Sequence, residues 1–492
     1  MKRLVAYNAV NKCKVALSMN KTTPLVEHIS TNERHTHVIT HSHHDSHTHP
    51  ILYSLFFGAL NPVMLNETTD KQEILRKLRA RAKETDAPIV AYEYKLTAEL
   101  TSKDLEEFNG YVLLVDSSMH SGVANAKLLL EVMKRKSREM IGSCDHEGIS
   151  EDFQFLALGI MEEQVKDKGV EEAVKWVRQR IKQGTTSMDE KIILTDTEWE
   201  IFKVAAKRIE HEAGFQPIRS VYVRNDLFVK NPERYVLEGE SLGIRVGVKW
   251  VGDGGLGSKT AALGDGTYVD GTRGHLTIPI NHQNFQAVED YINMLRDHGI
   301  TDLAVHAIGD KTIGIVLDMV SRFNRAGITV SIEHFELPTQ RQIYEAARMQ
   351  VPLNMQLNYS TEVWRYAQWA GRLVDRINPV KRILDSYSNH SRNGKLPIRF
   401  GTDGMPQSML WAIACGVNHP IKEQRITLEQ AIEHSKDTNG VILLKRGVYD
   451  SLPKLDLRGA AVNREASSAL LDSGVDMVIR KLPVGYSVSV NV

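Results

Sequence analysis

Histidines that stand two residues apart are the most distinctive chemical feature of this sequence. His47 and His49 flank Thr48, shortly after Asp45. In an extended segment alternate side chains point to the same side, so both imidazoles could reach one metal ion. A histidine-rich, metal-binding surface segment is an equally good interpretation of the tract by itself. The tract holds eight of the 19 histidines: His28, His35, His37, His41, His43, His44, His47 and His49.

Two further histidines end apolar runs of the kind that form buried strands. His306 lies in the run Leu303–Ala307, and His334 directly follows the run Val330–Glu333. A single histidine at a strand end is more often a core residue than a ligand. Two of them on successive parallel strands face the same end of a sheet, which favours a metal site over coincidence.

An aspartate and a lysine occupy comparable places. Asp403 ends an apolar segment between small residues, where it could cap a loop or bind a metal ion and accept a proton from water. Lys249 lies inside an apolar run and is followed by the glycine-rich segment 252–257, which suggests a backbone close to a ligand. A lysine inside a strand either extends to solvent or is functional.

Together these residues form a set of nitrogen and oxygen ligands. Such ligands suit zinc, with iron, nickel and manganese as alternatives. A bound ion would lower the pKa of water and polarise a carbonyl group. Asp403 would pass the proton to a leaving amine, so the predicted reaction is hydrolysis of a C–N bond.

The elements that must position these residues follow a strand–helix rhythm. Continuous apolar runs of this kind suit parallel strands covered on both faces. A (β/α)8 barrel is the first prediction and a doubly wound open sheet the second. A helix is expected from Phe285, with Asn284 as N-cap and Gly299 as its stop, and others over 313–323 and Thr427–Arg446. The predicted strands are Tyr111–Val115, Ile218–Val223, Ile244–Val251, Leu303–Ala307, Val330–Glu333, Val351–Gln356 and Pro397–Gly401.

The composition excludes several classes of protein. Lys and Arg total 61, as do Asp and Glu, so there is no basic excess for binding a nucleic acid. The longest apolar stretch, Ile51–Leu65, is too short and too interrupted to span a membrane. Three widely spaced cysteines indicate no disulfide framework, so a cytoplasmic location is the expectation.

Several segments resemble the amidohydrolase superfamily, specifically its family-3 branch of metal-dependent hydrolases. The resembling segments are Asp45–Pro50, Val248–Leu263 (VKWVGDGGLGSKTAAL), Leu303–Asp310 (LAVHAIGD), Ile332–Glu336 (IEHFE) and Phe400–Gly404 (FGTDG). Residues 119–126 and 184–186 match the family less well. Together the segments follow the order of the family over about residues 45–440.

The resemblance implies a role for each matching residue. His47, His49, His306 and His334 would be metal ligands, and Lys249, carboxylated or free, a further ligand or bridge. Asp403 would be a metal contact and the catalytic acid and base. One or two divalent ions, most readily zinc, and a small-molecule substrate are implied. The pocket residues implied by the weaker match are His120 and Asn125.

The resemblance also implies a domain organisation. The expected fold is a distorted (β/α)8 barrel over 45–446. The charged, helical pattern of about residues 68–185 separately predicts a mostly helical insertion there. The chain ends, 1–44 and 447–492, depart from the pattern of the family and would form a reduced β-sandwich. Known activities of the branch include cleavage of N-substituted amides, and some relatives are regulators of exoenzyme production. A regulatory protein without catalysis is therefore the alternative function, and a homo-oligomer is compatible with either.

Overall fold

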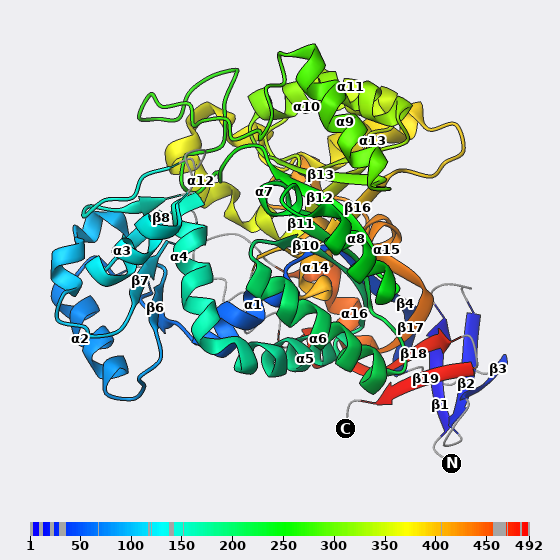
Figure 1. Cartoon of the computed structure of the whole chain (residues 1–492). Coiled ribbons are helices and arrows are strands. Elements are labelled where there is room, and N and C mark those ends of the chain that lie inside the picture. Colours follow the sequence, from blue (N-terminus) through cyan, green and yellow to red (C-terminus); the bar gives the residue numbers. More distant parts are fainter. Residues whose placement is uncertain are drawn as a thin grey trace.

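Eight parallel strands form the centre of the molecule (Figure 1). The computed structural model describes residues 3–8, 13–19, 24–28, 36–66, 68–116, 119, 121–136, 142–150, 152–404, 406–455, 469, 471–482 and 485–490. Each central strand pairs in parallel with the next in chain order. The strands are β4 (His37–Thr48), β10 (Thr185–Ile193), β11 (Ile218–Arg224), β12 (Arg245–Val251), β13 (Asp302–Ala307), β14 (Thr329–His334), β15 (Leu353–Gln356) and β16 (Ile398–Gly401).

The last strand returns to the first and closes the barrel. The amide of Asp403 donates to the carbonyl of His47 at 2.8 Å. The buried carboxylate of Asp45 accepts from the amide and the hydroxyl of Thr402, at 2.9 and 2.6 Å. A Cβ atom at Gly401 would lie 2.5 Å from the backbone nitrogen of His47, so only glycine allows this approach. The predicted (β/α)8 barrel is thus confirmed.

Helices between the strands cover the barrel, and their apolar faces join its strands in one core. Asn284 caps α9 as predicted, accepting from the amides of Gln286 and Ala287. Among the described residues, no helix has the length and apolar character needed to cross a membrane. The helices are α6 (Asp196–Ala213), α7 (Asn225–Phe228), α8 (Pro232–Ser241), α9 (Phe285–Asp297), α10 (Asp310–Arg325), α11 (Gln340–Met349), α12 (Val363–Ala370), α13 (Val380–His390), α14 (Met409–Val417) and α15 (Leu428–Ser435).

One predicted helix was wrong in its second half. Thr427 does cap a helix, but α15 ends at Ser435 and the chain continues as β17 (Lys436–Lys445). Gly440 and the apolar run that follows it favour a strand, because glycine and β-branched residues disfavour a helix interior. In the opposite direction, β10 was not predicted, because its sequence TTSMDEKII is polar although all nine residues are buried.

The two chain ends meet at the first barrel strand. The first half of β4 pairs in parallel with β1 (Arg3–Asn8) and antiparallel with β17. On one side the sheet continues through β2 (Cys13–Met19) and β3 (Pro24–His28), and on the other through β18 (Val475–Leu482) and β19 (Gly485–Val490). Figure 1 shows both termini beside these strands. β4 therefore spans the expected boundary at residues 44 and 45.

A second sheet lies within the insertion, to one side of the barrel (Figure 1). It has its own apolar core, formed with the helices around it. Its strands are β5 (Val63–Met64), β6 (Ile89–Tyr92), β7 (Val112–Val115), β8 (Ser121–Ala124) and β9 (Ile149–Ser150). The helices around it and along the barrel are α1 (Pro50–Tyr53), a π-helix over Ser54–Leu60, α2 (Lys71–Ala82), α3 (Ala126–Arg135), α4 (Asp152–Glu162) and α5 (Lys166–Lys182).

Candidate metal centre

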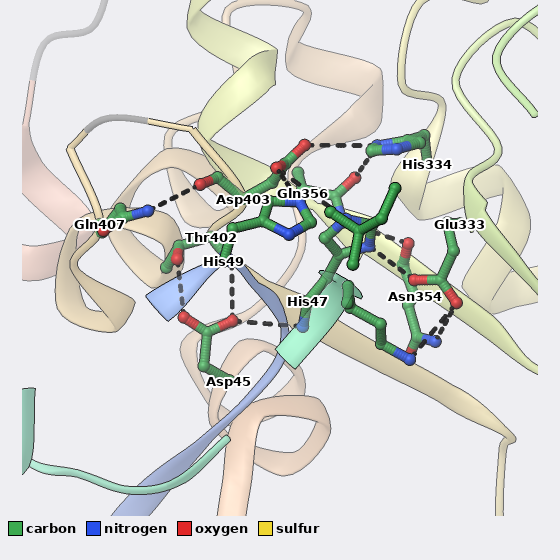
Figure 2. A network of polar contacts seen from close by, with 12 residues as sticks. Asp45, His47, His49, Glu333, His334, Asn354, Gln356, Thr402, Asp403 and Gln407 are labelled. Atoms are coloured by element: carbon green, nitrogen blue, oxygen red, sulfur yellow. Dashed lines mark hydrogen bonds and ion pairs between the residues drawn. The ribbon is translucent and has the colours of Figure 1, made fainter. Parts of the chain in front are cut away.

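Three side chains at the carboxyl end of the barrel could hold a metal ion together. One nitrogen each from His47 and His49 and one carboxylate oxygen of Asp403 all lie within 4.8 Å of one another. The two histidines lie at the end of β4, and Asp403 follows β16 with a φ of 48°. The barrel closure described above brings these two strand ends together, and Figure 2 shows Asp403 facing both imidazoles.

A buried carboxylate lies behind each of His47 and His49. Nδ1 of His47 donates to Oε2 of Glu333 at 2.6 Å, and Nδ1 of His49 lies 3.5 Å from Oε1 of Glu190. A carboxylate behind a ligating histidine fixes its ring and leaves the other nitrogen for the metal. In both residues that nitrogen is Nε2, which faces Asp403 at 3.9 Å from His47 and at 3.0 Å from His49.

The two imidazoles titrate differently in the metal-free protein. Burial and the positive charge of Lys249 lower the pKa of His47 to about 4. Burial also acts to lower the pKa of His49, but Asp403 and Glu190 outweigh it and raise this pKa to about 9. A metal ion must therefore displace a proton from His49 at neutral pH.

His306 and His334 complete a row of imidazoles across the mouth of the barrel. Their ring centres are 4.4 Å apart, and those of His334 and His47 are 4.8 Å apart. Oxygen atoms also contact this second pair: His306 donates to the carbonyl of Gly254 at 3.1 Å and lies 3.5 Å from Oδ1 of Asp253, and His334 donates to the amide oxygen of Gln356 at 2.7 Å. Figure 2 shows His334 reaching toward Asp403, from which it is 3.8 Å away.

Lys249 is a buried lysine that lines the cavity beside these histidines. Only 3% of the residue is exposed, and its Nζ atom has no hydrogen-bond partner among the described residues. Burial lowers the pKa of its amine to about 8. A buried polar atom without a partner is costly, so the position of Lys249 suits an amine that gains a ligand or is carboxylated.

These groups all face one cavity of about 1050 Å³. The barrel supplies its floor, and the insertion supplies part of its wall, including Tyr92 and Asp116. Tyr366 and Trp369, from the aromatic cluster of α12, lie on another part of the wall. The six predicted ligands that line it are His47, His49, Lys249, His306, His334 and Asp403.

Of the two predicted pocket residues, Asn125 does not line this cavity. Asn125 is buried as the N-cap of α3, where its side chain accepts from the amide of Leu128 and donates to the carbonyl of Gly110. Asn125 is not one of the described residues that line the cavity. His120 lies outside the described residues, so its assignment stays a prediction.

Several residues of the site were not predicted from the sequence. Glu190 and Glu333 orient ligands, Lys191 lies 3.5 Å from Glu333, and the hydroxyl of Tyr359 donates to Oδ2 of Asp403 at 2.8 Å. Glu333 carried a usable signal, because a charged residue next to His334 in an apolar strand needs a buried partner. Glu190 and Lys191 carried none, because their strand was not recognised.

Comparison with known proteins adds to this geometry. A sequence model of the amidohydrolase family matches residues 44–432. An uncharacterised metal-dependent hydrolase from Pyrococcus furiosus is 20% identical, with 87% of this chain and 90% of that chain covered and a TM-score of 0.60. One from Pyrococcus horikoshii OT3 is 19% identical, with 92% and 97% covered and a TM-score of 0.64.

At these identities the structural likeness concerns the fold. Among proteins with curated descriptions, none matches this sequence. The family model nevertheless spans most of the chain, and the matched residues include His47, His49 and Asp403. The chain therefore belongs to the amidohydrolase family and is a hydrolase of that family.

Proposed function

We propose that this protein hydrolyses an amide-type C–N bond, other than a peptide bond, in a small molecule. The observation that carries the proposal is the convergence of His47, His49 and Asp403 within 4.8 Å at the floor of a large cavity. His306 and His334 lie on the same floor and would extend the ligand set to a second ion.

The residues present fit a divalent metal, and zinc is the first choice. Imidazole nitrogens and a carboxylate are usual zinc ligands, and the unpartnered amine of Lys249 offers another, directly or as a carbamate formed with CO2. When bound, such an ion supplies a Lewis acid that polarises a carbonyl group and lowers the pKa of water toward neutrality.

Asp403 is the residue we assign to proton transfer. Tyr359 donates to its Oδ2 at 2.8 Å, and Nε2 of His49 lies 3.0 Å from its Oδ1, so both carboxylate oxygens are held in place. Although burial acts to raise its pKa, His47 and His49 lower it well below its usual range. The carboxylate is therefore ionised and able to take a proton from water and return it to the leaving nitrogen.

The test combines metal analysis with a substrate screen. Zinc-loaded protein should contain one or two zinc ions per chain and hydrolyse members of a panel of N-acetyl and N-formyl amines. Asp403→Asn should lower turnover by about a hundredfold to ten-thousandfold while the protein stays folded. His41→Ala is the matched control, because His41 belongs to the same tract but lies before the ligand pair, and should leave turnover unchanged.

Two outcomes would count against the proposal. Full activity of Asp403→Asn would remove the assigned proton transfer. A folded, zinc-bound protein that cleaves no member of the panel would favour the regulatory alternative or a hydrolase of another bond type.

A further inference from the structure

A buried glutamate in the wall of the cavity has no role in the proposed reaction. Glu336 follows the end of β14 by two residues, is 4% exposed and lines the same cavity as the candidate ligands. Its Oε1 atom has no hydrogen-bond partner among the described residues. An unpaired buried carboxylate is costly to maintain, which indicates a use for it.

The backbone at Glu336 is held in place. At the end of β14 the chain passes through two consecutive non-glycine residues with positive φ, His334 at 73° and Phe335 at 50°. Such a turn is strained and persists only where its surroundings enforce it. Here Phe335 is fully buried, and the carbonyl of Glu336 accepts from the amide of Asn378 at 2.8 Å. The backbone position of Glu336 is thus set by the same turn that presents His334.

The charges that act on Glu336 have the same sign as its own. Burial and the carboxylates of Glu362, Asp253 and Asp403 raise the pKa of Glu336 to about 8, and a bound cation would favour its ionised form. Glu362 is also buried and lines the same cavity. This part of the wall therefore carries two buried carboxylates, Glu336 and Glu362, which we call the acidic wall.

Aromatic rings from the same segment of the chain line the cavity too. Glu362 directly precedes α12, and Tyr366 and Trp369 of that helix have ring centres 5.5 Å apart. Tyrosine and tryptophan faces attract ammonium and guanidinium groups, as buried carboxylates do. Acidic and aromatic groups in one cavity thus share a preference for an organic cation.

We propose that the acidic wall binds a positively charged group, an ammonium or guanidinium, on the substrate at a distance from the bond that is cleaved. This inference rests on the proposed function for the amide and deepens it: the substrate class is a cationic amide, such as a mono-acylated diamine. Glu336 is the specificity-determining residue, because its Oε1 atom has no hydrogen-bond partner within the part of the chain that the structure describes.

Binding of two matched probes tests the inference apart from catalysis. N-(ω-aminobutyl)acetamide carries an ammonium group, and N-pentylacetamide is its uncharged isostere with a methyl group in that place. Their dissociation constants are measured by calorimetry on the zinc-loaded Asp403→Asn protein, in which the amide should survive. The charged probe should bind more tightly by about tenfold or more.

Glu336→Gln in the same background should weaken the charged probe by about thirtyfold or more and leave the neutral probe unchanged. Glu345→Gln is the matched control, because Glu345 pairs with Arg341 on the surface of α11, and it should change neither constant. Zinc content is measured for each variant and should stay constant, since Glu336 is not assigned as a ligand.

The outcomes separate the two proposals. Equal binding of both probes, or equal weakening of both in Glu336→Gln, would overturn the acidic wall even if the enzyme hydrolyses amides. Loss of zinc in Glu336→Gln would overturn it in favour of a metal ligand. A charge preference that disappears in Glu336→Gln, without turnover of either probe by the unsubstituted enzyme, would support the acidic wall and refute amide cleavage.

Discussion

Two glutamates three residues apart, Glu333 and Glu336, are both buried yet have opposite surroundings. The oxygens of Glu333 accept from His47 at 2.6 Å, Ser331 at 2.7 Å and Asn354 at 2.8 Å, as Figure 2 shows in part. Oε1 of Glu336 has no partner among the described residues. The first carboxylate is used to build the protein, whereas the second is left available to a ligand.

The buried lysines repeat the contrast. Nζ of Lys191 lies 3.5 Å from Glu333 and 4.0 Å from the centre of the Tyr222 ring, whereas Nζ of Lys249 has no hydrogen-bond partner among the described residues. Glu333 and Lys191 thus form a paired cluster. Glu336 and Lys249 face the cavity without such partners. Burial alone therefore does not distinguish these two pairs of charges, whereas their partners do.

The largest effect is expected from breaking the paired cluster. Glu333→Gln leaves Lys191 buried without its anion, so the free energy of unfolding should fall by about 3 kcal/mol. Chemical denaturation of the metal-free protein measures this. The double variant Glu333→Gln with Lys191→Met should regain part of the loss, because no unpaired charge then remains. If Glu333→Gln lowers the free energy of unfolding by less than about 1 kcal/mol, Glu333 is not a structural charge in the sense that distinguishes it from Glu336.

A second pair of buried carboxyls extends the comparison to pH. Glu162 and Glu198 are fully buried in α4 and α6. Burial raises the pKa of both, and the charge of Glu198 raises that of Glu162 further. Their folded-state pKa values thus exceed the unfolded value of about 4.3, so the folded protein holds protons that the unfolded chain releases.

The free energy of unfolding should therefore fall as pH rises from about 4.5 through neutrality, by about 1–3 kcal/mol from this pair. Denaturation at several pH values would show the slope. Glu198→Gln should flatten it, and an unchanged slope in that variant would assign the pH dependence to other groups.

A smaller effect of opposite sign is expected at Lys249. Lys249→Met replaces an unpartnered buried amine by an apolar side chain of similar length, so the metal-free protein should become more stable by about 1 kcal/mol. Zinc content should fall in the same variant if Lys249 is a ligand. If Lys249→Met destabilises the protein as much as Glu333→Gln does, Lys249 stabilises the fold in the same way as Glu333 and Lys191.

The smallest effect is expected at Glu336. Burial and the carboxylates of Glu362, Asp253 and Asp403 raise the pKa of Glu336 to about 8, so Glu336→Gln replaces a group whose charged form is disfavoured, and the free energy of unfolding should rise by less than about 1 kcal/mol. The comparison between Glu333 and Glu336 requires an increase in stability, since a buried group kept for binding a ligand destabilises the protein when the ligand is absent. A clear loss of stability would show that Glu336 supports the fold.

Most strands of the barrel could be predicted from the sequence, because they are continuous apolar runs that end in chemically distinct residues. His306, His334 and Asp403 were located in this way, and all three line the cavity. β10 was not readable, because a polar sequence is buried there by partners from distant strands. Its register shifts at Met188–Asp189 and between Glu190 and Ile193, so alternation does not reveal which side chains point inward.

The resemblance to a family supplied the ligand assignment within the histidine tract, which spacing alone left open. It could not indicate the partners of the ligands. Glu190 reaches His49 from the neighbouring strand β10, and Glu333 reaches His47 from β14 across the barrel, and such contacts depend on strand order and side-chain direction. The free oxygen of Glu336 is likewise a property of three-dimensional packing that no motif encodes.

The shared strand β4 also has a consequence for how the molecule assembles. Its partners β1 and β17 come from opposite ends of the chain, and the contact from His47 to Asp403 closes a loop of more than three hundred residues. Contacts between residues so far apart in sequence cost loop-closure entropy before they stabilise the chain, and they therefore slow folding. The candidate ligands are thus brought together only when the barrel closes, so during synthesis a nascent chain can assemble the proposed metal site only after β16 has left the ribosome.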